Sequence, residues 1–302
     1  MCGIVGLFLK NPELEPQLGA LLAAMLKTMT DRGPDSAGFA VYGSDGAGVK
    51  LTLRGPDADA LAGAVSGLED ALGGGVEATA RDTHSVIALA ADQEETARKW
   101  LSANAPGIDV VSAGKRMEIY KETGLPENVA KRFDLSTMTG THGIGHTRMA
   151  TESAVTTNGA HPFSTGLDEC LVHNGSLSNH NDMRRRLQRE GITFATKNDT
   201  EVAAGYLSWR MREGASLKDA LESSLTDLDG FFTFVVGTES GFAVVRDPIA
   251  CKPAVMAETD DYVAFGSEYR ALIGLPGIDK ARVFEPEPAK VYAWERVSGE
   301  RH

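Results

Sequence analysis

The chain has 302 residues, of which 42% are hydrophobic, so it can bury a sizeable core in one large domain or two smaller ones. Its 30 Lys and Arg against 42 Asp and Glu give a net charge of −12, which argues against nucleic acid or an anionic membrane as the main partner. No apolar run approaches the roughly 18 residues of a membrane span, and a signal-peptide pattern is missing at the amino terminus. We therefore expect a cytoplasmic protein.

Metal and cofactor signatures are weak throughout the sequence. The three cysteines are too few and too scattered for a disulfide framework, an iron–sulfur cluster or a structural zinc site: Cys2, Cys170 and Cys251. Three histidines lack a short helical ligand spacing and are interpreted as structural: His146, His161 and His173. The glycines at 73–75 lack the Lys-Ser/Thr of a phosphate-binding loop, so a turn is expected there. We expect neither a metal nor a cofactor in this chain.

A candidate nucleophile stands at the very start of the chain. If Met1 is removed, which a residue as small as Cys2 permits, Cys2 carries both a thiol and a free α-amine. The reference pKa values of these groups are about 8.5 and about 8, so the amine can accept the thiol proton near neutral pH. For an isolated Met-Cys pair, a small residue that begins a buried strand is the better interpretation. The motifs farther along the chain favour the nucleophile.

The first forty residues predict two strands and a helix. Residues 2–9 combine small and apolar side chains and predict a buried strand, and residues 37–42 predict a second one. Between them, Asn11 and Pro12 offer an N-cap followed by proline at the first helical position. Apolar residues then recur at three- and four-residue intervals up to Met29, so we expect one long amphipathic helix.

Residues from about 49 to about 139 interrupt the series of motifs. They predict a strand at 85–90, a helix at 93–103 and a strand at 109–112. We interpret this stretch as an inserted small α+β subdomain and suggest that it docks a partner.

The last third of the chain groups its helices and its strands. Helices are expected at residues 179–189, 201–211 and 217–228, followed by strands at 231–236, 242–246, 254–257, 262–266 and 290–294. Such grouping favours a layered α+β fold over a doubly wound parallel sheet. Arg184, Arg185 and Arg186 form a basic cluster, interpreted as a solvated helix face or a docking patch.

Five motifs in a fixed order carry a specific resemblance. They are Cys2-Gly3-Ile4-Val5-Gly6, Arg32-Gly33-Pro34-Asp35, the segment 145–151, His173-Asn174-Gly175 and Asn198-Asp199-Thr200-Glu201. With them, residues 1 to about 43 and 140 to about 270 resemble the class II glutamine amidotransferase domain of the N-terminal nucleophile hydrolases. The resemblance implies one domain over 1–302, interrupted by the insert. It also implies a four-layer αββα fold, in which two antiparallel sheets lie between layers of helices.

The same resemblance assigns the catalytic and binding residues. The Cys2 sulfur would attack the γ-amide carbonyl of glutamine, and the Asn174 side chain and the Gly175 N–H would receive the oxyanion. In the rest of the site, Arg148 would bind the α-carboxylate and Asp199 the α-ammonium. The binding set is completed by Thr151 at the carboxylate end and by Arg32, for which a loop that closes over glutamine and a simple turn have similar weight.

Two phrases, at residues 143–153 and 173–181, carry a closer resemblance. They are similar to the amidotransferase subunit of split glutamate-synthase-like enzymes, such as N-methylglutamate synthase. This similarity implies a hetero-oligomer in which synthase subunits carry FMN and an iron–sulfur cluster. It also raises the hypothesis that the site accepts γ-glutamylmethylamide, as an enzyme of methylamine metabolism would.

Two other function classes stay open at this point. One is an N-terminal-Cys hydrolase acting on another amide, against which Arg148 and Asp199 argue, because together they select an amino acid. The other is a non-catalytic scaffold. With Met1 retained, the Cys2 nitrogen is part of an amide and cannot act as a base.

Overall fold

A computed structural model describes residues 2–44, 46, 48–150 and 154–296. Its largest sheet has seven strands in the order β15-β13-β14-β1-β8-β2-β7, and the ladders between them are antiparallel. The strands are β1 (Gly3–Leu9), β2 (Ser36–Tyr42), β7 (Met117–Thr123), β8 (His142–Arg148), β13 (Val255–Glu258), β14 (Tyr262–Gly266) and β15 (Arg282–Phe284). Every residue of β1 is buried, because the strand pairs on both edges and is covered on both faces. The start of the chain is therefore part of the core.

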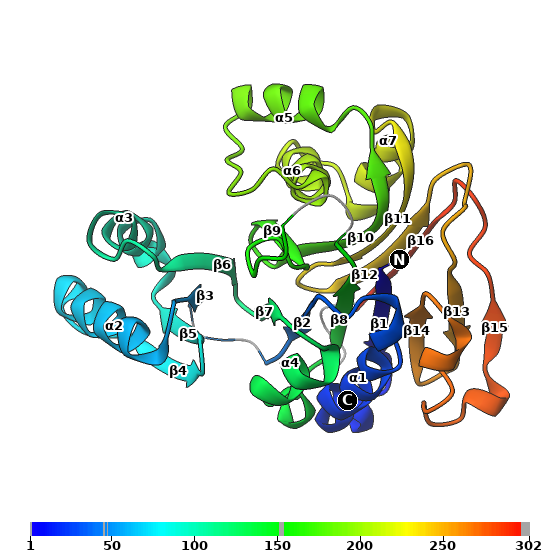
Figure 1. Cartoon of the computed structure of the whole chain (residues 1–302), viewed down its shortest axis with the longest axis horizontal. Coiled ribbons are helices and arrows are strands. Elements are labelled where there is room, and N and C mark those ends of the chain that lie inside the picture. The colour runs from blue at the N-terminus through cyan, green and yellow to red at the C-terminus, as the bar shows by residue number, and fades with distance from the viewer. Residues whose placement is uncertain (1, 45, 47, 151–153, 297–302) are drawn as a thin grey trace.

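A second sheet packs face to face on the first (Figure 1). Its order is β16-β12-β11-β10-β9, with β9 (Phe163–Gly166), β10 (Glu169–Leu177), β11 (Gly230–Gly237), β12 (Gly241–Arg246) and β16 (Val291–Glu295). One buried cluster joins the two sheets, with Ile4 and Ile144 from the first and Val172 and Val235 from the second. Interlocking of these apolar faces holds the two sheets together.

Helices cover the outer faces of the two sheets. The helices α1 (Leu18–Lys27) and α4 (Pro126–Arg132) share a buried cluster with the first sheet, and α5 (His180–Arg189), α6 (Asp199–Arg212) and α7 (Leu217–Asp227) share one with the second. The short 3₁₀ turns are η1 (Pro12–Gln17), η2 (Thr30–Arg32), η3 (Ala91–Gln93), η4 (Leu135–Thr137), η5 (Tyr269–Ala271) and η6 (Ile278–Lys280). The helix expected after Pro12 begins as η1, which contains Pro16, and becomes α-helical at Leu18. A proline inside a helix lacks the N–H that the regular ladder requires.

A separate four-stranded sheet projects from one end of the molecule, coloured cyan in Figure 1. Its order is β4-β5-β3-β6, with β3 (Val49–Arg54), β4 (Glu77–Arg81), β5 (His84–Leu89) and β6 (Asp109–Gly114). Two helices, α2 (Ala58–Leu72) and α3 (Glu94–Asn104), form a small core of their own with it. We call residues 49–114 the insert sheet.

The insert sheet ends earlier than the boundary expected near residue 139. The chain returns to the seven-stranded sheet at Met117, where β7 pairs with β2 so that Tyr42 and Met117 lie opposite each other. Asp168, which is buried in the turn before β10, fixes this return. Its carboxylate accepts hydrogen bonds from the backbone nitrogens of Lys115 (2.7 Å), Arg116 (2.9 Å) and Met117 (2.9 Å).

The α+β class predicted from the sequence is confirmed, as are the grouped helices and strands of the last third. Within the described residues, no helix is both long enough and apolar enough to cross a membrane.

Buried histidines make the stability of this fold depend on pH. His142 is fully buried, its Nε2 donates to the Thr238 carbonyl oxygen (2.9 Å), and burial lowers its pKa to about 3. The unfolded chain takes up this proton near pH 6.5, so the contribution to stability is complete above pH 6.5 and is lost as the pH falls toward 3. We expect the free energy of unfolding to fall by about 2 kcal/mol for this histidine between pH 6.5 and 5.

Urea denaturation at several pH values measures this loss. His142→Gln removes the titrating group and should flatten the slope of unfolding free energy against pH, even if it lowers stability at every pH. An unchanged slope in this variant would contradict the prediction.

Candidate functional site

A cavity of about 700 Å³ opens where the start of β1 meets the two sheets and the start of α6. Because β1 and β8 are antiparallel and Gly3 pairs with Thr147, the start of β1 lies beside the end of β8. Five of the seven predicted site residues line this cavity: Cys2, Arg148, Asn174, Gly175 and Asp199. Thr151 lies outside the described residues, and Arg32 lies outside the described lining of the cavity.

The backbone around Cys2 is fixed by contacts from distant parts of the chain. The Cys2 carbonyl oxygen accepts hydrogen bonds from Arg32 Nε (2.9 Å) and from Asn174 Nδ2 (3.2 Å). Two residues farther on, the Ile4 nitrogen donates to Ser267 Oγ (2.9 Å), and the Ser267 nitrogen donates to the Ile4 carbonyl (2.9 Å). The half-buried Cys2 thus begins a strand whose position is determined by both sheets.

Arg32 lies behind Cys2. Its side chain is buried, and Nη1 lies 2.8 Å from Glu268 Oε1. The hydrogen bond from Arg32 lowers the pKa of the Glu268 carboxyl group. Arg32 therefore links η2, the Cys2 carbonyl and the segment after β14.

The rest of the Arg-Gly-Pro-Asp motif holds the end of β8. A Cβ atom on Gly33 would lie 2.5 Å from the backbone nitrogen of Arg148, so a larger residue would displace that segment. The Asp35 nitrogen donates to the Arg148 carbonyl (3.1 Å), and Asp35 Oδ2 accepts from the Ala150 nitrogen (2.8 Å). The close approach and the two hydrogen bonds explain why a glycine and an aspartate stand at these positions.

A cation and an anion line the same cavity. The side chain of Arg148 is only 7% exposed. Asp199 begins α6, where a carboxylate is favoured by the helix dipole, and its Oδ2 accepts from the Leu177 nitrogen (3.0 Å). Asn198 caps this helix by accepting from the Thr200 nitrogen (2.8 Å). The arrangement suits a ligand that carries both charges, as an α-amino acid does.

Asn174 and Gly175 enter the cavity from β10 in the second sheet. Asn174 is buried, and one of its amide hydrogens already points to the Cys2 carbonyl. Gly175 has φ +153°, and a Cβ atom there would lie 2.0 Å from the Phe231 carbonyl oxygen. Only glycine fits this position without displacing β11.

Three buried histidines lie beside the cavity, and two of them contact Thr200. His161 Nε2 and His173 Nδ1 lie 2.8 Å and 3.0 Å from Thr200 Oγ1, and His146 Nε2 donates to the His173 carbonyl (3.1 Å). Burial lowers the pKa of all three, that of His146 to about 3, so they are neutral near pH 7. Among the described residues, no group of three His, Cys, Asp or Glu side chains is arranged to hold a metal ion.

The sequence did not single out several contacts that shape the site. Lys252 lines the cavity, and its ammonium lies 4.9 Å from the centroid of the Phe231 ring. Arg184, which was grouped with the basic cluster, donates to the carbonyls of Thr196 (2.7 Å) and Asn198 (3.0 Å). It thus fixes the segment before α6 that lines the cavity. The Lys252-Pro253 pair extends the series of motifs that carries the family resemblance, but no role was predicted for Lys252. No local pattern distinguishes Arg184 from its neighbours.

Comparison with known proteins agrees with this geometry. The family model for the glutamine amidotransferase domain matches residues 146–274. The chain is 63% identical, over 98% of both lengths, to the "Glutamine amidotransferase-like protein GlxB" of Rhizobium meliloti (strain 1021). The chain belongs to the class II glutamine amidotransferase family. A further member, described as a "Putative glutamine amidotransferase" of Methanothermobacter thermautotrophicus, is 34% identical over 97% of this chain and 99% of that protein.

Solved structures support the amidotransferase fold. Glutamine phosphoribosylpyrophosphate amidotransferase from B. subtilis superposes with a TM-score of 0.62 at 20% sequence identity. The match covers 97% of this chain and 47% of that one, so the chain spans about half the length of this solved relative.

The contacts of Arg184 yield a prediction for this amidotransferase site. Arg184→Gln removes two charge-assisted hydrogen bonds to backbone carbonyls, so we expect faster amide exchange in residues 195–199 and a loss of about 2 kcal/mol of stability. Hydrogen exchange with mass spectrometry measures the first effect, and urea denaturation the second. Arg185→Gln on the same helix is the matched control, since that side chain is exposed and pairs with Asp182 within the helix. Equal exchange in both variants would contradict the prediction.

Proposed function

We propose that this chain is a glutaminase subunit that hydrolyses the γ-amide of glutamine through Cys2 and passes the ammonia to a partner synthase. The observation that carries the proposal is the gathering of a terminal-strand cysteine, a cation, an anion and an amide pair around one cavity of about 700 Å³. We further propose that its two sheets and their outer helices form the four-layer αββα arrangement of the N-terminal nucleophile hydrolases.

Glutamine binds in this proposal by its amino-acid end. Arg148 pairs with the α-carboxylate, assisted by Thr151, and Asp199 receives the α-ammonium. The backbone contacts of Asp35 and Leu177 hold the segments that carry these two charges, so substrate binding requires little rearrangement. Arg32 supports binding from behind, by holding Cys2 in place.

Cleavage then proceeds in two steps, the formation of a thioester on Cys2 and its hydrolysis. After removal of Met1, the α-amine of Cys2 takes the thiol proton, and the sulfur attacks the γ-carbonyl carbon. The second amide hydrogen of Asn174 and the Gly175 N–H stabilise the oxyanion, and loss of one such donor typically costs about 10²–10³ in rate. The proton returns to the leaving nitrogen, ammonia departs, and water cleaves the thioester to give glutamate.

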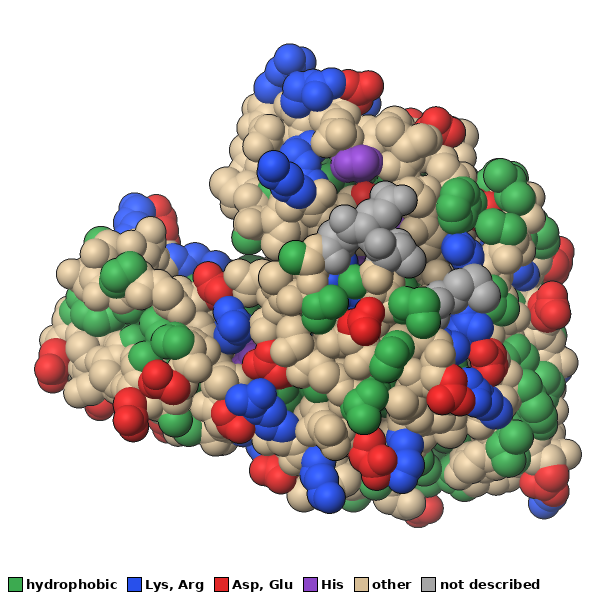
Figure 2. Space-filling view, in the orientation of Figure 1, with side chains coloured by type: hydrophobic (Ala, Val, Ile, Leu, Met, Phe, Trp, Pro, Cys, Tyr) green, Lys and Arg blue, Asp and Glu red, His purple; other side chains and the backbone are tan. Residues whose placement is uncertain are grey.

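The partner in this proposal is a glutamate-synthase-like subunit, of which N-methylglutamate synthase is our favoured example. FMN and the iron–sulfur cluster would then reside on the partner subunits. Exposed apolar side chains near the cavity support such docking: Met149 (37% exposed), Val155 (46%), Phe231 (36%) and Ile249 (69%). Figure 2 shows hydrophobic side chains in several small groups on one face of the molecule. Grouped exposed apolar residues commonly mark a protein–protein contact.

Intact-mass measurement with 6-diazo-5-oxo-norleucine, a glutamine-like electrophile, tests the function. We expect loss of Met1 and one adduct on Cys2, because the reagent carries the same charged end as glutamine. Cys2→Ala should abolish the adduct, whereas Cys251→Ala should retain it, although Cys251 is the more exposed of these two thiols. Retained Met1 and no adduct, with partner subunits present, would overturn the proposal in favour of a scaffold role.

The substrate hypothesis has its own test. Because Arg148 and Asp199 would contact only the amino-acid end, we expect the complex to release methylamine from γ-glutamylmethylamide as well as ammonia from glutamine. Chromatographic detection of both amines measures this, with Cys2→Ala as the control. Free hydrolysis of glutamine without any release of methylamine would reject the wider substrate range.

A further inference from the structure

The insert sheet touches a turn that supports the proposed carboxylate-binding arginine. Residues 156–160 form this turn, in which the Gly159 nitrogen donates to the Thr156 carbonyl (3.1 Å) and the Ala160 nitrogen to the Thr157 carbonyl (3.0 Å). Gly159 lies against the guanidinium of Arg148, since a Cβ atom there would be 3.3 Å from Arg148 Nη1. A shift of the 156–160 turn therefore changes the space that Arg148 occupies.

Asn158 connects this turn to two charged residues of the insert sheet. Arg54 ends β3 and Asp109 begins β6, and these two residues pair across the sheet, with Nη1 3.3 Å from Oδ2. Asn158 contacts both of them. Its Oδ1 accepts from Arg54 Nη1 (3.2 Å), and its Nδ2 donates to Asp109 Oδ2 (3.3 Å). The Asn158 side chain thus directs its oxygen to the Arg54 guanidinium and its NH2 group to the Asp109 carboxylate.

A second series of contacts joins the turn to the insert sheet. The Thr157 hydroxyl donates to Glu122 on β7, and Arg132 Nη1 lies 3.5 Å from the other oxygen of Glu122. Arg132 Nε in turn lies 2.8 Å from Asp82 Oδ2, in the turn between β4 and β5. The insert sheet is therefore connected to the turn in two places: directly to Asn158, and through Glu122 and Arg132 to Thr157.

The core side of the turn is held more firmly than the insert side. Lys121 is buried and donates from Nζ to the carbonyls of Ala160 (3.0 Å) and Pro162 (3.3 Å). On the insert side, the Arg54 and Asp109 side chains are 23% and 47% exposed. Exposed ion pairs contribute little to stability, so these contacts can adjust the position of the turn without controlling the fold.

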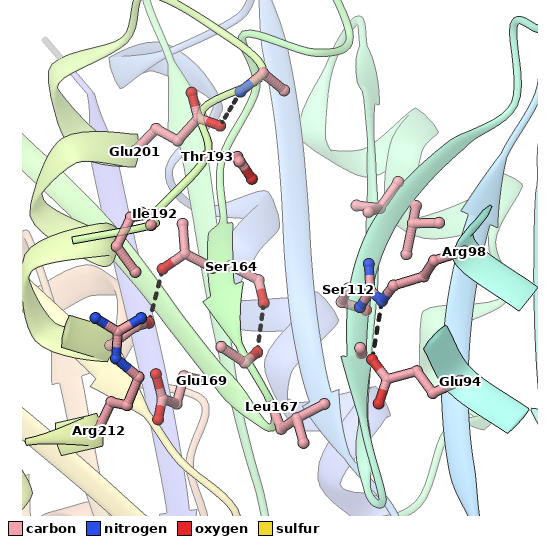
Figure 3. A pocket seen from close by; sticks show the side chains of 18 of the residues that line it. Glu94, Arg98, Ser112, Ser164, Leu167, Glu169, Ile192, Thr193, Glu201 and Arg212 are labelled. Atoms are coloured by element: carbon pink, nitrogen blue, oxygen red, sulfur yellow. Dashed lines mark hydrogen bonds and ion pairs between the residues drawn. The ribbon is translucent and has the colours of Figure 1, made fainter. Parts of the chain in front are cut away.

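A groove beside these contacts separates the insert sheet from the core. It has a volume of about 700 Å³, with Glu94 and Arg98 of α3 on one wall and Ser164 and Glu169 on the other (Figure 3). A smaller hollow of about 360 Å³ shares Arg98 and Ser164 with it and reaches Asn158. Little packing therefore crosses between α3 and the core, which leaves Asn158 as a point of contact at the end of the groove.

We propose that the insert sheet sets the affinity of the cavity for glutamine through Asn158, a positioning residue that acts on Arg148 by way of the 156–160 turn. The inference rests on the proposed function, because it assigns Arg148 to the substrate carboxylate. It concerns substrate binding and not the thiol chemistry, since the turn contacts the arginine while Cys2 is fixed by Arg32 and Asn174.

Substitutions at Asn158 separate binding from chemistry. Asn158→Ala should raise the KM for glutamine about 5- to 10-fold, the effect of losing a hydrogen-bonded contact, and leave kcat within about twofold. Inactivation by 6-diazo-5-oxo-norleucine should need a correspondingly higher concentration. Alkylation of Cys2 by iodoacetamide, which lacks the amino-acid end, should keep its rate in a Cys251→Ser background.

A charge exchange provides a rescue that a general loss of structure would not show. Asn158→Asp replaces the donor that faces Asp109 by a second carboxylate, which Arg54 offsets only in part, and should also raise the KM for glutamine. In the double variant with Asp109→Asn, the amide at position 109 can donate to the carboxylate at position 158. The KM for glutamine should then return close to that of the original chain. Lys99→Ala, on the exposed face of α3 where it pairs with Glu95 of the same helix, should leave the KM unchanged and serves as the control.

The outcomes distinguish this inference from the function on which it rests. The inference alone is overturned if the original chain is active but Asn158→Ala and Asn158→Asp leave the KM unchanged. It is also overturned if adding Asp109→Asn to Asn158→Asp does not restore the KM. No hydrolysis and no adduct in the original chain overturns the proposed function. If Asn158→Ala fails to fold, the paired substitutions at Asn158 and Asp109 decide the question.

Discussion

The hydrogen bonds to the Cys2 carbonyl are the constraint on which the rest of the site depends. The first residues of a chain usually fray, yet Cys2, in the nucleophile role that we propose, must stay within a fraction of an ångström of its working position. Here β1 lies inside the seven-stranded sheet, and Arg32 and Asn174 approach Cys2 from two different elements. The Asn174 contact connects β10 of the second sheet to the residue that precedes β1 of the first sheet. The packing of the two sheets therefore fixes the position of Cys2.

The charged groups around Cys2 are each held by another part of the fold. Arg32 pairs with Glu268, Asp199 at the start of α6 accepts the N–H of Leu177 at the end of β10, and Asp35 secures the backbone that carries Arg148. Buried charges without such partners are costly. The motif residues therefore divide into those that line the cavity and those that keep its charged members in position, and both kinds are necessary for an amino-acid site.

The sequence pattern predicted the elements of the last third well, because α7 has a clear apolar face and β12 is a short, wholly buried run of mostly apolar residues. The helix α2 was not predicted, although Leu61, Ala64 and Leu68 recur at three- and four-residue intervals and are buried. The strand β4 was not predicted because it is an exposed edge strand without an apolar face. Motifs located most of the cavity. The partners of those motif residues could not be predicted because they are distant in sequence: Arg32 and Glu268, for example, are 236 positions apart. No local pattern reveals such a pairing.

The insert sheet leaves and re-enters the core between two residues that already face each other, Tyr42 and Met117. The insert therefore stands where a hairpin turn would join β2 to β7, and a short turn in its place would leave every strand pair of the seven-stranded sheet intact. A change in the length or sequence of the insert thus leaves the course of the chain through the two large sheets unaltered, and with it the positions of Cys2, Asn174 and Gly175.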